Sequence, residues 1–152
     1  KDSNWEVKVI ITEIDVDQMK LNGIMKARSE IKNQELITTS WKGEIIDFDH
    51  HFLYTHGKWA NDRIEKEFWS KTKAFDGYKD QLDSVEDYQA FQDRIHQDFV
   101  LMRWKETHFV NCEADQSGLS IQGFYFVCQS KSNGSIEGLS LKRKQKLIIQ
   151  SL

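Results

Sequence analysis

Alternation of apolar and polar positions dominates the first third of the chain. Between residues 5 and 14, apolar side chains take every second position along most of the run. Successive side chains of a strand point to opposite faces, so this pattern is typical of a half-buried β-strand. Met19–Ala27 and Glu35–Ile46 show the same tendency, and the polar residues Asp15–Gln18 join the first two strands into a predicted hairpin.

The period changes in the middle of the chain. Asp62–Phe75 places apolar residues at helical spacing, and Ser84–Asp87 resembles a capping box before a second amphipathic stretch. Two helices are therefore predicted. Residues 62–98 contain 10 acidic and 6 basic residues, a balance that indicates an exposed helical insertion, about residues 60–97, rather than part of the core.

The last third returns to strands. Asn133 and Gly134 both tolerate positive φ and predict a tight hairpin turn. The predicted strands of this part are Phe99–Glu106, Leu119–Cys128, Ser135–Leu141 and Leu147–Leu152. Because closure of a sheet removes its exposed edges, the pattern favours a mostly β fold: an antiparallel closed β-barrel of about eight strands with one helical insertion, forming a single domain over residues 1–152.

Composition narrows the classes of function. A net charge of −3 argues against a general nucleic-acid binder, which needs a basic footprint. No apolar run reaches the roughly 18 residues needed to span a bilayer, so no membrane segment is expected. Two cysteines are too few for a disulfide scaffold, which favours a reduced, cytoplasmic protein. No cofactor is expected.

Glu106 is the most unusual residue of the predicted sheet. In a strand it shares one face with Val100, Met102 and Trp104, so an apolar row ends in a carboxylate. A carboxylate beside apolar neighbours needs a hydrogen-bonding or positive partner. An Arg or Lys on a neighbouring strand would satisfy it, and so would a cationic ligand at the mouth of the barrel.

Several motifs in the same order and spacing resemble one protein family. Met102–Glu106, Gly123–Tyr125 and Ser135–Gly138 closely resemble the substrate-receptor subunit of the GID (also called CTLH) ubiquitin ligase, and weaker similarity covers almost the whole chain. The resemblance implies a non-catalytic receptor that binds the free N-terminus of target proteins, Pro or another hydrophobic residue, within the barrel and directs them to ubiquitination and degradation. It also implies a scaffold subunit as partner, bound through a C-terminal tail not in this chain.

The resemblance assigns roles to individual residues. Glu106 and Tyr125 match the pair that holds the amine, and Ser120 matches a polar contact to the peptide backbone. Ser120 and Tyr125 have opposite parity in a regular strand, so a bulge at Gly123 is expected between them. The positions that match the pocket wall are Val7, Met25, Ala27, Ile37, Ser140 and Gln150.

Three wall or loop positions depart from the family pattern. Ser140 replaces an expected tyrosine, Ala27 an expected isoleucine, and Glu30 an expected leucine. Smaller and more polar side chains at these positions predict a roomier pocket that also admits residues larger than proline.

Two other functions fit parts of the sequence. A lipocalin-like barrel would carry small hydrophobic molecules regardless of any amine. A metal-dependent hydrolase would use the cluster of Asp47, Asp49, His50, His51 and His56, whose side chains are typical metal ligands. The further Asp and His motifs that a phosphoesterase of this kind needs are missing from the chain.

Overall fold

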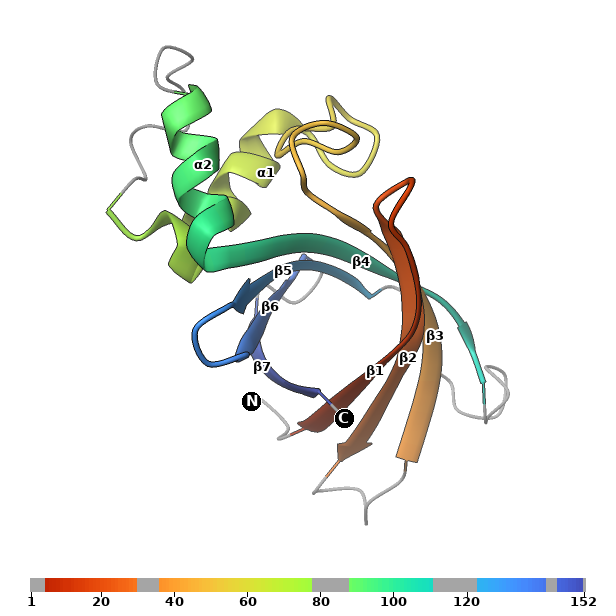
Figure 1. Ribbon diagram of the computed structural model, residues 1–152. Coiled ribbons are helices and arrows are strands. Elements are labelled where there is room, and N and C mark those ends of the chain that lie inside the picture. Colours follow the sequence, from red (N-terminus) through yellow and green to blue (C-terminus); the bar gives the residue numbers. More distant parts are fainter. Residues whose placement is uncertain (1–4, 30–35, 78–87, 111–122, 142–144, 152) are drawn as a thin grey trace.

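The chain folds into an antiparallel sheet that curls on itself, with helices packed against one side (Figure 1). The structure is a computed structural model and describes residues 5–29, 36–77, 88–110, 123–141 and 145–151. The strands among them are Trp5–Asp15 (β1), Lys20–Ser29 (β2), Leu36–Ile45 (β3), Phe99–Phe109 (β4), Phe124–Ser130 (β5), Ile136–Ser140 (β6) and Gln145–Ser151 (β7). The helices are Asp62–Ser70 (α1), the 3₁₀ turn Lys73–Phe75 (η1) and Tyr88–Asp98 (α2).

Strands that follow one another in the chain are neighbours in the sheet. The six pairings from β1–β2 to β6–β7 are all antiparallel, which confirms the predicted antiparallel sheet. β7 returns to β1 through two residue pairs only, Lys8 with Gln150 and Val9 with Ser151, and these are parallel.

The seam between β1 and β7 corrects the predicted closed antiparallel barrel of about eight strands. The described residues form seven strands, and in an up-and-down order an odd number leaves the first and last strands running in the same direction. An antiparallel seam therefore cannot form. The sheet meets itself over a short parallel contact instead of a full ladder.

The sheet separates two apolar cores. The inner core lies within the curl, and its buried members include Val9, Met25 and Met102. The outer core lies between the sheet and the helices and includes Leu101 and Phe126. Neighbouring residues of β4 thus enter opposite cores, as the alternation predicted.

The helical insertion is part of the outer core, so the prediction of an exposed insertion was wrong. Phe68 and Trp69 of α1 are buried, and their rings contact Phe126 of β5 at centroid distances of 5.1 Å each. Apart from Glu65, the described charged residues of α1 and α2 lie on the remaining faces, which a charge count cannot distinguish from exposure all round. α1 begins at Asn61, whose side chain accepts a hydrogen bond from the Ile64 N–H. Neither described helix is long and apolar enough to cross a membrane.

A buried ionic network joins the insertion to the sheet. Arg103 of β4 is fully buried, and its Nη atoms lie 3.4 Å from Oε1 of Glu44 and 3.3 Å from Oε2 of Glu65. Thr55 donates to both oxygens of Glu65, from its N–H and its hydroxyl. Burial raises the pKa of Glu65 and lowers that of Arg103, and their mutual contact opposes both shifts.

Candidate functional site

Two tryptophans fill the interior of the curled sheet. The rings of Trp41 (β3) and Trp104 (β4) stack with centroids 4.3 Å apart, and both side chains are fully buried. Each ring lies over a glycine of the preceding strand: a Cβ on Gly23 would lie 2.7 Å from Trp41 Cζ2, and one on Gly43 would lie 2.6 Å from Trp104 Cδ1. The stacked rings fill the space between the strands at this level, which disfavours the deep cavity of a lipocalin-like carrier.

Glu106 lies next to the stacked tryptophans, because it is directly opposite Trp41 in the β3–β4 ladder. Its carboxylate accepts hydrogen bonds from the hydroxyl of Thr39 on β3 and from the hydroxyl of Tyr125 on β5, the latter at 3.2 Å. Donors on both flanking strands therefore orient the carboxylate. Glu106 and Tyr125 are thus in hydrogen-bond contact, and their assignment to the binding of an amine, which the resemblance implies, stays a prediction.

Because Gly123 has no side chain, the Glu106 carboxylate can lie directly against its backbone. A Cβ built on Gly123 would lie 1.6 Å from Oε1 and 2.5 Å from Cδ of Glu106, closer than any real contact. The Gly123 carbonyl also accepts a hydrogen bond from the Glu106 N–H at 2.8 Å. The β4–β5 ladder runs without a shift from Phe124 onward, so the expected bulge does not fall within the described part of β5.

The partners of the Glu106 carboxylate are neutral. Among the residues whose side chains the structure describes, no Lys, Arg or His lies within ion-pair distance of Glu106. An arginine or lysine of a neighbouring strand, the simpler of the two interpretations, is therefore not found there. A carboxylate that is hydrogen-bonded by hydroxyls keeps lone pairs for a cationic group.

The other predicted site residues divide into two groups. Val7, Met25, Ile37 and Ser140 are buried and Ala27 is half-buried. Register places Met25 opposite Thr39, and Ser140 opposite Tyr125, so these two lie beside the donors to Glu106. Gln150 lies in β7 opposite Lys8. Ser120 and Glu30 fall outside the described residues, and their assigned roles stay predictions.

Thr39 is the site residue that sequence reasoning missed. It lies in the alternating run of β3 and shares parity with Ile37 and Trp41, so its inward direction was predictable. Its role depends on the β3–β4 register, which shifts between Ser40 and Trp41 and is not visible in either strand alone. The shift also explains why Thr39 reaches Glu106, although Trp41 is the residue opposite it.

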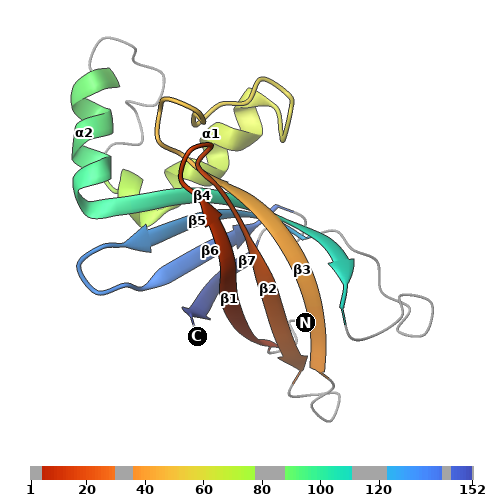
Figure 2. The same ribbon diagram turned by 45° about the vertical axis from the view of Figure 1, so that its right-hand side comes forward.

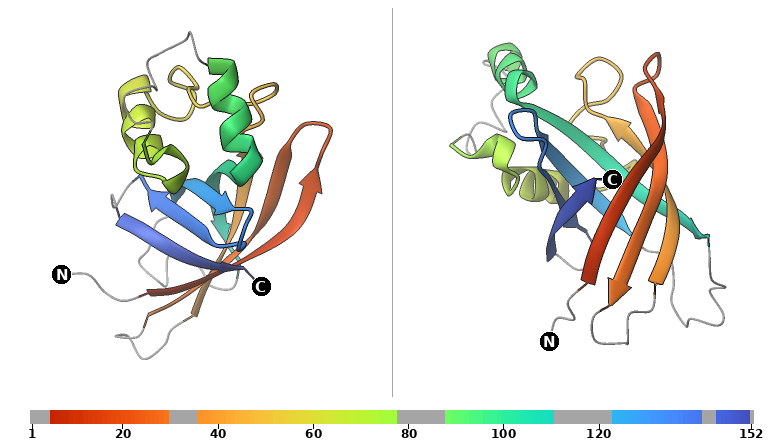
Figure 3. Two further views of the ribbon diagram at one scale, coloured as in Figure 1. Left: turned by 60° about the vertical axis from the view of Figure 1, so that its left-hand side comes forward. Right: turned by 60° about the horizontal axis from the view of Figure 1, so that its bottom comes forward.

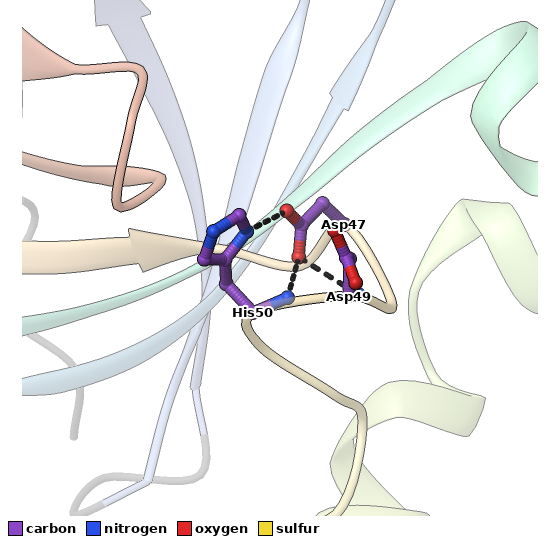
Figure 4. Close-up of side chains that lie close together, drawn as sticks. All are labelled: Asp47, Asp49 and His50. Atoms are coloured by element: carbon purple, nitrogen blue, oxygen red, sulfur yellow. Dashed lines mark hydrogen bonds and ion pairs between the residues drawn. The ribbon is translucent and has the colours of Figure 1, made fainter.

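The Asp and His cluster proposed for a hydrolase is a capped turn (Figure 4). Oδ1 of Asp47 accepts the backbone N–H groups of Asp49, His50 and His51, and Oδ2 contacts His50 Nδ1 at 2.7 Å. Burial acts to raise the pKa of Asp47, but these hydrogen bonds outweigh it and hold the pKa well below its usual range. The bond to Asp47 raises the pKa of His50.

The remaining histidines of that cluster have other partners. His51 Nδ1 lies 2.6 Å from Glu44, and its Nε2 lies 3.0 Å from the carbonyl of Gln18 in the β1–β2 turn. His56 lies 3.4 Å from Asp62 at the start of α1. Asp47, Asp49 and His50 stay together, with ligand atoms within 4.8 Å of one another, whereas His51 and His56 have other partners. Asp47 already uses its carboxylate to cap the turn, so the structure adds no support for a hydrolase.

Three relatives span nearly all of the chain. "Glucose-induced degradation protein 4 homolog" from Mus musculus is 33% identical over 150 residues, which cover 96% of this chain and 67% of that protein. Two Schizosaccharomyces pombe proteins are also similar. "GID complex substrate-recognition subunit 10" is 29% identical over 97% of this chain but only 28% of its own length. "GID complex substrate-recognition subunit 4" is 27% identical over 90% of this chain and 73% of its own.

These relatives agree with the resemblance drawn from the motifs of β4, β5 and β6, and that prediction is confirmed. Residues 1–152 also match the model of the family described as "Vacuolar import and degradation protein". The chain therefore belongs to the vacuolar import and degradation protein family.

Proposed function

We propose that this protein is a non-catalytic substrate receptor of a GID-type ubiquitin ligase, and that Glu106 binds the free N-terminal amine of its targets. The observation that carries the proposal is the half-buried Glu106 carboxylate, oriented by two hydroxyls beside the inner apolar core. The names of the two Schizosaccharomyces pombe relatives support the receptor role.

An N-terminal amine suits this carboxylate chemically. Its pKa of about 7.7 to 8 keeps it mostly cationic at pH 7, and it supplies hydrogen-bond donors as well as charge. Thr39 and Tyr125 hold the carboxylate in place before the peptide arrives, so little side-chain ordering is needed on binding. The first side chain of the peptide then lies among the wall residues above the stacked tryptophans.

The wall suggests which first residues are accepted. Ala27 and Ser140, where the family pattern has isoleucine and tyrosine, lie next to Val7 and Tyr125 by register. Their small side chains leave room beside the amine. We expect Pro and larger hydrophobic first residues to bind, followed by ubiquitination and proteasomal degradation of the target in the cytoplasm.

The partners follow from the same proposal. A receptor of this kind contributes selection, whereas the chemistry of ubiquitin transfer belongs to other subunits of the ligase. The targets are proteins that begin with an accessible first residue, and a scaffold subunit of the ligase is the second partner. Neither nucleic acid nor a membrane takes part.

Glu106→Gln is expected to weaken binding of a Pro-initiated peptide at least tenfold, about 1.4 kcal/mol. Glutamine keeps the shape and one acceptor oxygen, and its NH2 can donate to the other hydroxyl, but it removes the charge that attracts the amine. Acetylation of the peptide should weaken wild-type binding similarly, because it removes the positive charge and leaves the carboxylate unpaired, at about 1 to 3 kcal/mol. Isothermal titration of free and acetylated peptides, varied only at the first residue, measures both effects.

Glu13→Gln is the matched control, because Glu13 is an exposed carboxylate of the same sheet and bonds only to Asn22 among the described residues. It should leave the affinity unchanged. Equal affinities of wild type for free and acetylated peptides would contradict the role of Glu106, whatever the first residue.

The two hydroxyls are expected to act through Glu106. Thr39→Val and Tyr125→Phe each remove one donor to the carboxylate and should weaken the amine-dependent part of binding by about 0.5 to 1.5 kcal/mol. Thr39→Ser keeps the hydroxyl and should bind nearly as wild type. If Thr39→Val and Thr39→Ser weaken binding equally, Thr39 acts by packing and not by orienting Glu106.

A further inference from the structure

Four lysines lie on the outer face of the sheet. In β1 and β2, Lys8 and Lys26 alternate with inward-facing apolar residues and stand directly opposite each other. In β3 and β4, Lys42 stands directly opposite Lys105 in the same way. Among the residues whose side chains the structure describes, which leave out Glu6 and β7, none forms an ion pair with any of the four. Like charges at directly opposed positions destabilise a sheet.

A pair of isoleucines lies directly beside the first lysine pair and diagonal to Lys42 of the second. Ile10 and Ile24 are directly opposed, point outward and are half-buried. Along each strand the next outward residue is about 7 Å away, so Lys8 and Lys26 border the isoleucines on one side. On the other side, the next outward residue of β2 is Asn22, which stands directly opposite Lys42 of β3. We call this surface the lysine face: Lys8, Lys26, Lys42, Lys105, Ile10 and Ile24.

The helices leave the lysine face open. α1 and α2 pack against the outer side of β4 and β5 through the outer core, and Figures 2 and 3 show both helices on that side of the sheet, although the tip of the β1–β2 hairpin overlaps α1 in the projection of Figure 2. Among the described elements, none packs on the outward side of Ile10 and Ile24. An apolar centre with a charged border is the usual arrangement of a protein interface.

We propose that the lysine face binds an acidic segment of another protein, in which carboxylates flank apolar residues. The chain as a whole carries a net charge of −3, so two opposed lysine pairs on one face, the first directly beside an apolar pair, depart from its average surface. Carboxylates placed between the opposed lysines would replace repulsion by attraction, and the isoleucines would bury apolar side chains. A nucleic acid would use the lysines but gain little from the isoleucines. The proposal is independent of Glu106.

The probe is a synthetic peptide with two central isoleucines flanked by glutamates, acetylated so that it has no free amine. NMR titration at low salt should shift the amide signals of β1 and β2 and give saturable binding, weaker at higher salt. The combined variant Lys8→Glu and Lys26→Glu should bind at least tenfold more weakly. Ile24→Ser should also bind more weakly, although the lysines remain.

The control variant is Lys58→Glu with Lys73→Glu, two exposed lysines away from this face. It should bind the probe as wild type does. The proposal is overturned if the control weakens binding equally, if no saturable binding occurs, or if a single-stranded RNA binds better than the peptide and Ile24→Ser has no effect.

A stability measurement tests the repulsion itself. Lys26→Glu turns the opposed pair into an attractive one, so its Tm should rise while probe binding weakens. If the substitution only destabilised the fold, both the Tm and the probe binding would decrease. An unchanged or lower Tm would contradict the like-charge repulsion from which the proposal starts.

Discussion

Arg103→Met is expected to lower the free energy of unfolding by about 3 to 5 kcal/mol, because it leaves buried carboxylates without their cation. Arg103 is fully buried between Glu44 and Glu65, and it also donates to the carbonyl of Leu53 at 2.6 Å. Total stabilities of domains are typically about 5 to 15 kcal/mol, so the variant should lose a large share of its stability. Urea unfolding followed by tryptophan fluorescence measures the difference.

Two further variants identify the cause of the loss. Arg63→Met replaces an exposed arginine of α1 and should change stability by no more than about 0.5 kcal/mol. Adding Glu65→Gln to Arg103→Met removes the unpaired charge but keeps an acceptor for Thr55. That double variant should be more stable than Arg103→Met alone. If it is less stable, shape and not charge explains the effect of Arg103.

The network also shows what sequence reasoning about the insertion lacked. The amphipathic spacing of Phe68 and Ile95 predicted two helices correctly, because a period of 3.6 is a property of one segment. The burial of Glu65 and Arg103 was not predictable in the same way. A charged residue is buried only when its partner lies opposite, and here the partners are 38 residues apart in the chain.

The site was predictable to a similar extent. Alternation placed Glu106 on the inner face with Trp104, and the resemblance added Tyr125. Contacts between different strands could not be predicted from the sequence. These are the hydrogen bond from Thr39 to Glu106, the parallel seam that follows from the strand number, and the position of Gly123 against the carboxylate. Each depends on how separate strands are paired, whereas the alternation within a strand depends on local sequence alone.

Gly123→Ala is expected to weaken binding of a Pro-initiated peptide about a hundredfold, roughly 2.7 kcal/mol. The new Cβ would lie 1.6 Å from Oε1 of Glu106, so the carboxylate must leave its position. It would then lose the hydroxyls of Thr39 and Tyr125, and the methyl group would occupy the space from which the carboxylate is proposed to bind the amine. The loss should therefore exceed that of Glu106→Gln, which keeps the shape of the site. Titration calorimetry of both variants with one peptide compares them.

Gly77→Ala separates loss of binding from loss of stability. Gly77 has φ +87° and nothing within 4 Å of an added Cβ, so alanine there strains the backbone far from Glu106 without a clash. It should lower Tm and leave the affinity unchanged. Gly123→Ala should do the reverse if Glu106 can turn toward the open end of the sheet: a modest change in Tm with a large loss of affinity. Wild-type affinity in Gly123→Ala would mean that the carboxylate position seen here is not the one that binds the amine.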